Sequence, residues 1–297
     1  MNEMEKYNME KEVEVKEKKH IKIAGITLWR IVAYFIIYSV AGFIIETIFG
    51  VLTKGVLESR KSFLYGPFCS IYGLGAVLMI LPLQRFKKNN YTLFAAGFVI
   101  GSIIEYLVVE WFGGHLVEKI YHEKWWDYSD QILNLNGRIC VLFSLFWGLL
   151  AIYLMSDINK RVDKLIDFLK KKISMGILKT AVVLVSIFLA FDLGITAYAL
   201  QMFTIRIVHD NNLNVANKQY IDEQYEKIYV KDTKQKEFIL KYFDDEKMIK
   251  TFPNIKIEDV DGNILFYRKY VKDIKPYYYN FRSNSHLKLK YFEDVDY

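Results

Sequence analysis

The chain has 297 residues, 53% of them hydrophobic, and a formal net charge of +6. Its two cysteines are too few for a disulfide framework or a cysteine zinc site, so small folds stabilised in those ways are excluded. The positive charge suits an anionic membrane surface and requires no nucleic-acid partner.

The first segment, residues 1–25, is a charged tail with six Lys and six Glu. Its mixed charge predicts a solvated segment rather than a binding element. The apolar run that follows is too long for the core of a signal peptide. We therefore expect this run to be retained as a first membrane span.

Five apolar runs follow the tail, and each is long enough, or nearly so, to cross the ~30 Å hydrocarbon core of a bilayer. They mostly lack the polar stripe of period 3.6 that marks a soluble amphipathic helix. The predicted spans are residues 26–52, 64–84, 91–112, 139–156 and 177–208. The sequence therefore predicts an all-α polytopic membrane protein with a transmembrane domain over 26–208.

Lysine and arginine gather in the tail, in the 85–90 turn and in the 157–179 segment. Four intervening spans would place these three segments on one side of the membrane. Because short basic segments stay in the cytoplasm, we assign that side to the cytoplasm. The 53–63 and 113–138 loops then face outward.

The fifth span decides the side of the remaining chain. A single tilted helix over 177–208 is the simpler reading, and it places residues 209–297 outside the cytoplasm. A re-entrant hairpin around Asp192 and Gly194 would instead leave them inside.

Residues 209–297 have nearly balanced charge and predict a small α+β domain. The 217–250 segment has a helical pattern. Two strand-like segments, 255–260 and 264–271, flank Asp261-Gly262-Asn263, a turn sequence that suits positive φ. We therefore expect a β-hairpin there.

The first and third spans share a pattern, Ala-Gly-Phe-Ile-Ile at 41–45 and Ala-Gly-Phe-Val-Ile at 96–100. A glutamate follows each, and the next span in each case opens with Gly-x-x-Cys and continues to an aromatic-Gly pair. These matches predict a duplicated helical hairpin, although biased membrane composition can produce short matches by chance. Repeated membrane folds often place their site at the repeat interface.

Glu46 and Glu105 are the glutamates that follow the repeated pattern, and glycines lie on the same helix face as each. Because small residues let membrane helices approach closely, each carboxylate should point into the bundle. An ionised carboxylate there costs several kcal/mol unless it is paired. Arg60 and Arg138 are the cations available on the outer side, and Asp192 is a third buried acid.

The 113–138 loop carries Trp125-Trp126-Asp127-Tyr128-Ser129 and then Asn134-Leu135-Asn136-Gly137-Arg138. Tryptophan and tyrosine prefer the membrane interface, where charged residues need partners. We therefore predict an outward-facing polar site; the alternative is that its acid–base pairs only fix helix register. The predicted substrate-binding or ion-relay residues are Glu46, Arg60, Glu105, Asp127 and Arg138, supported by Tyr72, Glu118, Trp125, Trp126, Asn134, Asn136 and Asp192.

Other chemistries find less support. His115, Glu118 and His122 could share a helix face, but Gly113-Gly114 weakens that helix, so we predict no metal site and no cofactor. No Ser or Cys has an adjacent base, and no G-x-x-x-x-G-K-[ST] loop is present. The sequence favours a protein that is not itself an enzyme, and ATP-driven transport would need a separate ATP-binding subunit.

Over residues 30–200 the chain resembles the ABC-transporter type IV permease-like membrane proteins of low-GC Gram-positive bacteria. The resemblance is carried by Gly42-Phe43, Glu46, Arg60, Phe63 to Pro67, Ile71 to Gly75, Glu105-Tyr106, Glu118, Trp125 to Ser129, Asn134 to Arg138, Trp147-Gly148 and Asp192. One departure is Ser70, where the family usually has proline. The resemblance implies a permease component of a bacterial plasma membrane and is compatible with a homo-oligomer.

The leading interpretation is permease-like transport, either alone or as the membrane subunit of a transporter. One alternative is an intramembrane enzyme that acts on lipid or cell-envelope precursors. The other is a structural or sensory membrane protein.

Overall fold

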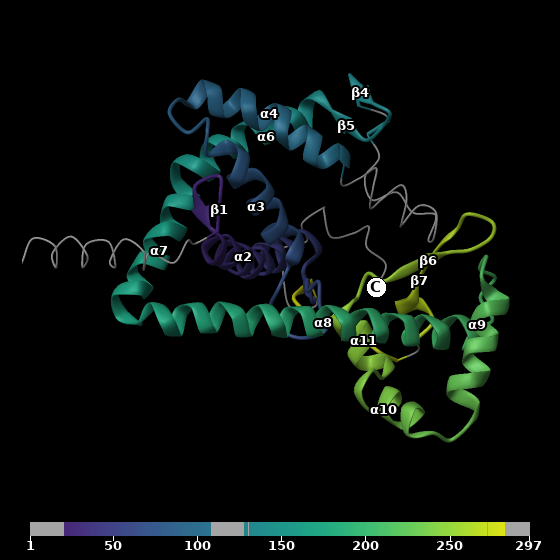
Figure 1. Cartoon of the computed structure of the whole chain (residues 1–297). Helices are drawn as coiled ribbons and strands as arrows, with labels where there is room; N and C mark the ends of the chain where they lie inside the picture. Colours follow the sequence, from purple (N-terminus) through teal and green to yellow (C-terminus); the bar gives the residue numbers. More distant parts are fainter. Residues whose placement is uncertain (1–20, 108–127, 130, 272, 283–297) are drawn as a thin grey trace, which may run out of the picture.

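The structure, a computed structural model, describes residues 21–107, 128–129, 131–271 and 273–282 (Figure 1). Apolar helices make up most of its N-terminal part, because a helix satisfies its backbone hydrogen bonds internally where water is absent. These helices are α2 (Leu28–Lys54), α3 (Ser70–Leu83), α4 (Asn90–Leu107), α6 (Val141–Tyr153) and α8 (Met175–Asp210).

Within the described part of the chain, four helical segments are long and apolar enough to cross a membrane. They are Leu28–Lys54, Asn90–Leu107, Val141–Lys172 and Met175–Asp210. The prediction of an all-α polytopic membrane protein is confirmed. Because α8 is one continuous helix of 36 residues, the alternative of a re-entrant hairpin around Asp192 is wrong.

The predicted second span, residues 64–84, differs from the structure. Its helix, α3, has only 14 residues. At 1.5 Å per residue it is about 21 Å long, shorter than the ~30 Å hydrocarbon core. The preceding residues form a loop, since Gly66 has a left-handed backbone with φ +70° and Pro67 has no N–H to donate.

The fourth predicted span continues into a further helix. A π-helical turn, Leu154–Ile158, joins α6 to the amphipathic helix α7 (Asn159–Lys172). In Figure 1, α7 runs across the end of the bundle at a steep angle to α4 and α8. Such a turn widens the helix locally and redirects the chain that follows it.

The apolar helices pack as two hairpins, α2 against α3 and α4 against α6. α3 and α4 join the hairpins, and α8 packs against α2. The buried side chains of this core include Tyr34, Tyr38, Met79, Leu93 and Ala151.

The bundle has two ends, which we name by what lies there (Figure 1). The basic end carries the turn between α3 and α4, helix α7, and the short hairpin β1–β2 (Lys22–Ile23 and Ile26–Thr27). The domain end carries the hairpin β4–β5 (Asn134–Leu135 and Ile139–Cys140) and the C-terminal domain. The 85–90 turn and helix α7 of the 157–179 segment therefore lie at the same end as residues 21–25, the described part of the tail.

The C-terminal domain combines short helices with a β-hairpin. Its elements are α9 (Lys218–Tyr225), a π-helical turn (Glu226–Val230), α10 (Lys234–Tyr242), α11 (Asp245–Thr251), β6 (Lys256–Glu258), β7 (Ile264–Phe266) and a 3-10 turn (Tyr267–Lys269). β6 pairs with β7 in antiparallel register, and Gly262 in the connecting turn has φ +84°. The predicted hairpin is present, but its second strand ends at Phe266 because the chain then turns into the 3-10 segment.

The C-terminal domain is built onto the last turns of α8. Phe203 of α8 is fully buried against Tyr267, with ring centroids 5.6 Å apart. Arg206 of α8 forms an ion pair with Asp245 and donates to the carbonyl oxygen of Phe243 at 2.9 Å. The domain also reaches α2, because β8 (Tyr279–Asn280) pairs with β3 (Val56–Leu57) directly after that helix.

Candidate functional site

The two hairpins repeat the same glycine contacts. A Cβ atom added at Gly73 would lie 2.4 Å from the carbonyl oxygen of Phe35, and one added at Gly148 would lie 3.0 Å from the carbonyl oxygen of Phe94. In both hairpins, therefore, a glycine of the second helix rests on the backbone of the first. These contacts support the duplicated hairpin.

A second pair of glycines aligns the two glutamates. A Cβ atom at Gly42 would lie 2.4 Å from the Cβ of Tyr72, and one at Gly101 would lie 2.5 Å from the Cβ of Trp147. Glu46 and Glu105 each follow their glycine by four residues. By these contacts Gly42 corresponds to Gly101, and Glu46 therefore corresponds to Glu105. In the sequence match of 41–45 with 96–100, Gly42 corresponds to Gly97 instead. The two alignments differ by four residues, about one helical turn.

Glu46 is half-buried and faces the second helix of its hairpin. The hydroxyl of Tyr72 donates to Glu46 Oε1 at 2.5 Å. Tyr72 therefore contacts both α2 residues of this site: its Cβ covers the glycine and its hydroxyl binds the carboxylate. The sequence analysis predicted Tyr72 as a supporting residue of the site, and the structure places it against Glu46.

Glu105 is more enclosed, with 9% of its surface exposed. Trp147 Nε1 donates to one carboxylate oxygen at 2.7 Å, and the Tyr128 hydroxyl donates to the other at 2.9 Å. Both donors are neutral. The site thus resembles that of Glu46, with Trp147 in place of Tyr72 and one further donor from the loop.

The β4–β5 loop holds Tyr128 over Glu105. The Tyr128 N–H donates to the carbonyl oxygen of Gly137 at 2.8 Å. Asn134 accepts the Gly137 N–H at 3.0 Å and donates to the carbonyl oxygen of Gln131 at 2.9 Å. Asn136 and Gly137 have φ of 54° and 69°, the left-handed turn geometry that Asn-Gly favours. Asn134 and Asn136 therefore shape the loop.

Arg60 lies beside α2, where a Cβ at Gly50 would come 2.9 Å from its guanidinium. That guanidinium forms an ion pair with Glu58 at 2.7 Å, and Lys54 reaches the same carboxylate at 2.9 Å. The sequence suggested a membrane glutamate as the partner of Arg60 and did not single out Glu58. The Glu58 side chain is only 1% exposed, so the pair is enclosed at the domain end.

Arg138 is the last residue of the β4–β5 turn, and its N–H donates to the carbonyl oxygen of Leu135 at 3.0 Å. Several predicted site residues lie outside the described residues. They are Glu118, Trp125, Trp126 and Asp127, together with the His115 and His122 of the weighed metal site.

Asp192 is fully buried in α8 and binds backbone. Both of its carboxylate oxygens accept the Tyr65 N–H, at 3.2 Å. Thr196, one turn later, accepts the Leu64 N–H at 2.8 Å and donates to Asp192 at 3.3 Å. Asp192 and Thr196 thus accept backbone N–H groups of the loop before α3. Without these acceptors the loop would bury unpaired N–H groups.

We expect Asp192→Ala to lower the free energy of unfolding by about 2 kcal/mol, because it removes a charged acceptor of a buried N–H. Thermal unfolding of the full chain in detergent measures the change. Asp192→Asn keeps one acceptor oxygen and should recover part of the loss. An Ala variant as stable as the parent would contradict the anchoring role.

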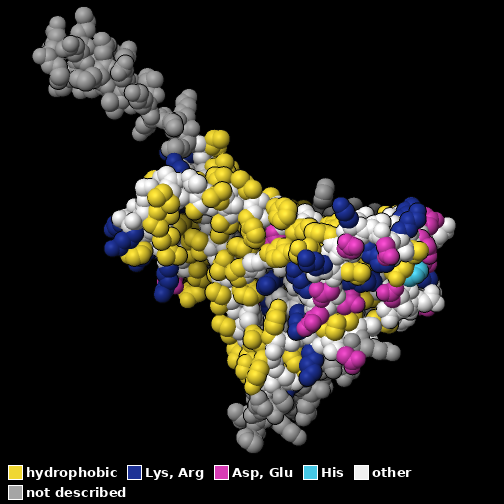
Figure 2. Space-filling view, turned by 90° about the horizontal axis from the view of Figure 1, so that it is seen from below, with side chains coloured by type: hydrophobic (Ala, Val, Ile, Leu, Met, Phe, Trp, Pro, Cys, Tyr) yellow, Lys and Arg dark blue, Asp and Glu magenta, His cyan; other side chains and the backbone are white. Residues whose placement is uncertain are grey.

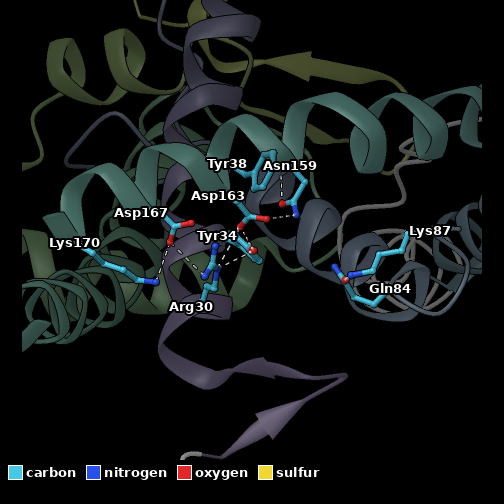
Figure 3. A network of polar contacts seen from close by, with 9 residues as sticks. All are labelled: Arg30, Tyr34, Tyr38, Gln84, Lys87, Asn159, Asp163, Asp167 and Lys170. Carbon is cyan, nitrogen blue, oxygen red and sulfur yellow. Dashed lines mark hydrogen bonds and ion pairs between the residues drawn. The ribbon is translucent and has the colours of Figure 1, made fainter.

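A polar network at the basic end escaped the sequence reasoning (Figure 3). Arg30 of α2 donates to Asp163 of α7 at 2.7 Å, and the Tyr34 hydroxyl binds the same oxygen through a short hydrogen bond. The Tyr38 hydroxyl donates to Asn159 at 3.2 Å, and the Asn159 amide reaches Asp163 at 3.5 Å. These contacts fix α7 across α2.

The spacing of these residues was a usable signal. Arg30, Tyr34 and Tyr38 recur every four residues on α2, as Asn159 and Asp163 do on α7. Residues four apart share a helix face. Two polar faces on neighbouring helical segments therefore indicate a contact, but they do not identify which face meets which.

Comparison with known protein families gives a match over more than half of the chain. The model of a family described as putative ABC-transporter type IV matches residues 33–197. The matched region contains both hairpins and α7, and ends within α8 before the C-terminal domain. No curated protein and no solved structure matches the chain.

Proposed function

The chain belongs to the family described as putative ABC-transporter type IV, and on that premise we propose that it is the permease subunit of a bacterial plasma-membrane transporter. Its helices and its family make it a membrane protein of transporter type. The permease role, the polar site and the partner subunit are the parts that we propose.

The equivalence of Glu46 and Glu105 is the observation that carries this proposal. Each carboxylate is held by a neutral aromatic donor from the second helix of its hairpin. Neutral donors orient a carboxylate without neutralising it, so each acid can still take up a proton or a cation. Buried acids within a membrane commonly mark ion or proton pathways.

A separate subunit would supply ATP hydrolysis, because the sequence has no G-x-x-x-x-G-K-[ST] loop. By the positive-inside rule the basic end faces the cytoplasm, where ATP is available, and the C-terminal domain lies outside. One continuous helical segment, Val141–Lys172, carries Trp147 at the Glu105 site and ends in α7. This connection offers a mechanical route between an ATP-binding subunit and the polar site.

The test uses full-length protein in liposomes, with proton, sodium and potassium fluxes followed by entrapped dyes. We expect Glu46→Gln and Glu105→Gln each to lower the flux at least tenfold while the thermal midpoint in detergent stays close to the parent value. Gln keeps the hydrogen-bond acceptor but removes the titratable charge. Glu223→Gln, at an exposed position of α9, is the matched control and should leave the flux unchanged.

Two results would contradict the proposal. One is a parent protein that moves no ion alone or with a co-purified ATP-binding subunit. The other is a pair of glutamine variants that unfold, which would show that the acids only hold the bundle together.

A further inference from the structure

Helix α7 lies across the bundle rather than along it. Figure 3 shows α7 crossing α2 at a steep angle, and Figure 1 shows α7 at a steep angle to α8. Because α2 and α8 are long enough to span a membrane, a helix that crosses their ends lies roughly in the plane of the membrane surface. Proteins place amphipathic helices there.

Both acidic residues of α7 already have cationic partners. Ile166 is buried in the bundle core. Asp163 pairs with Arg30, and Asp167 pairs with Lys170 at 3.0 Å. Both acids of α7 are therefore already matched by cations.

A face of α7 beside the inward one carries exposed lysines. Lys160, Lys164 and Lys171 are exposed and lie at i, i+4 and i+11, which places them along one face of the helix. No ion pair to any of the three is found among the described residues. Arg161, by contrast, is paired with Asp157 at 2.9 Å.

An apolar strip borders this basic face. Leu165 and Phe168 are 46% and 55% exposed, and Leu169 follows Leu165 by one helical turn. Figure 2 shows hydrophobic side chains over the middle of one face of the molecule and Lys and Arg at the end away from the C-terminal domain. Lys170 also lies 5.4 Å from the ring centroid of Trp29, a residue type that favours the membrane interface.

We propose that α7 binds the phosphate-bearing headgroups of anionic phospholipids in the leaflet at the basic end. Leu165 and Phe168 enter the acyl-chain boundary, and Lys160, Lys164 and Lys171 contact the headgroups. An anionic leaflet attracts lysine clusters, and the leaflet meets the bundle at the level where α7 lies. An acidic protein surface could also attract the lysines, but it would have to cover the exposed Phe168 side chain as well.

The test is native mass spectrometry of delipidated full-length protein, titrated with phosphatidylglycerol or with phosphatidylcholine. The parent should bind phosphatidylglycerol at least tenfold more tightly. Each lysine near an anionic surface contributes roughly fivefold in affinity. The triple variant Lys160→Gln, Lys164→Gln, Lys171→Gln should therefore lose most of this preference, and 0.5 M salt should weaken it in the parent, by about tenfold.

Two further variants keep the test decisive. The triple arginine variant at the same positions retains the charge and should retain the preference. Lys227→Gln, Lys231→Gln, Lys234→Gln removes three exposed charges from the C-terminal domain and should change nothing. A triple glutamine variant that keeps the full preference for phosphatidylglycerol overturns the proposal. If that variant also loses binding to a soluble protein, the lysines form a protein-binding surface instead.

Discussion

Gly97→Ala should destabilise the α4–α6 hairpin by about 1–3 kcal/mol, the usual cost of overpacking a core. A Cβ at this position would lie 2.2 Å from the Cβ of Ala151 and 2.9 Å from the carbonyl oxygen of Trp147. Neither neighbour is the end of a flexible side chain, so the helices themselves must separate. Thermal or denaturant unfolding in detergent measures the loss.

Gly75→Ala is the matched control, because a Cβ at Gly75 meets nothing within 4 Å. It should be neutral, or stabilising by up to ~1 kcal/mol through helix propensity. Gly97→Ala combined with Ala151→Gly removes the closest clash and should restore part of the stability. If Gly97→Ala and Gly75→Ala behave alike, the close packing of this hairpin is wrong.

Asp163→Ala should lower the free energy of unfolding by about 2–3 kcal/mol. The variant removes the partner of Arg30, Tyr34 and Asn159 at once. The side chains of Arg30 and Asp163 are 22% and 33% exposed. The expected loss therefore lies between the ~1 kcal/mol of a surface pair and the 3–5 kcal/mol of a fully buried one.

Asp157→Ala removes an ion pair in the turn before α7 and serves as the control. Its partner Arg161 is 76% exposed, so the expected loss is below ~0.5 kcal/mol. A double variant with Arg30→Met should be closer in stability to Asp163→Ala than the sum of the two single changes. Additive losses would contradict a direct Arg30–Asp163 interaction.

The prediction for Asp163 also separates two roles of α7. If the network only positions α7, Asp163→Ala should weaken the lipid preference proposed above without removing any lysine. The triple glutamine variant should instead lose the preference while keeping the unfolding midpoint. Measuring both quantities on both variants distinguishes positioning from binding.

Most of the fold followed from local sequence properties. The apolar runs predicted the long helices, and Asp261-Gly262-Asn263 predicted the hairpin of the C-terminal domain. The prediction failed where local chemistry was subtler: Gly66 and Pro67 shortened the second predicted span to α3. An apolar run that continues through a loop looks the same as one that is helical throughout.

The candidate site could be predicted only in part from the sequence. Glu46 and Glu105 were recognisable, because an acid in an apolar run is costly wherever the run folds. The hydrogen-bond donors to Glu105 were harder to predict, because Tyr128 and Trp147 lie 23 and 42 residues from it in the sequence. Arg60 was named only as a cation available to the membrane acids, and in the structure it forms an ion pair with Glu58.

The sequence by itself determined which segments are apolar, where charge gathers and which acids lie within the spans, because hydropathy and charge are sums over neighbouring residues. Only the tertiary structure decided the partners. The one-turn register that makes Glu46 equivalent to Glu105, and the pairing of Arg30 with Asp163 across 133 residues, depend on how the helices rotate and slide against one another. Contacts such as those of Gly97 and Gly101 set that rotation. They join two helices, and the register in which two helices pack cannot be read from the sequence of either one.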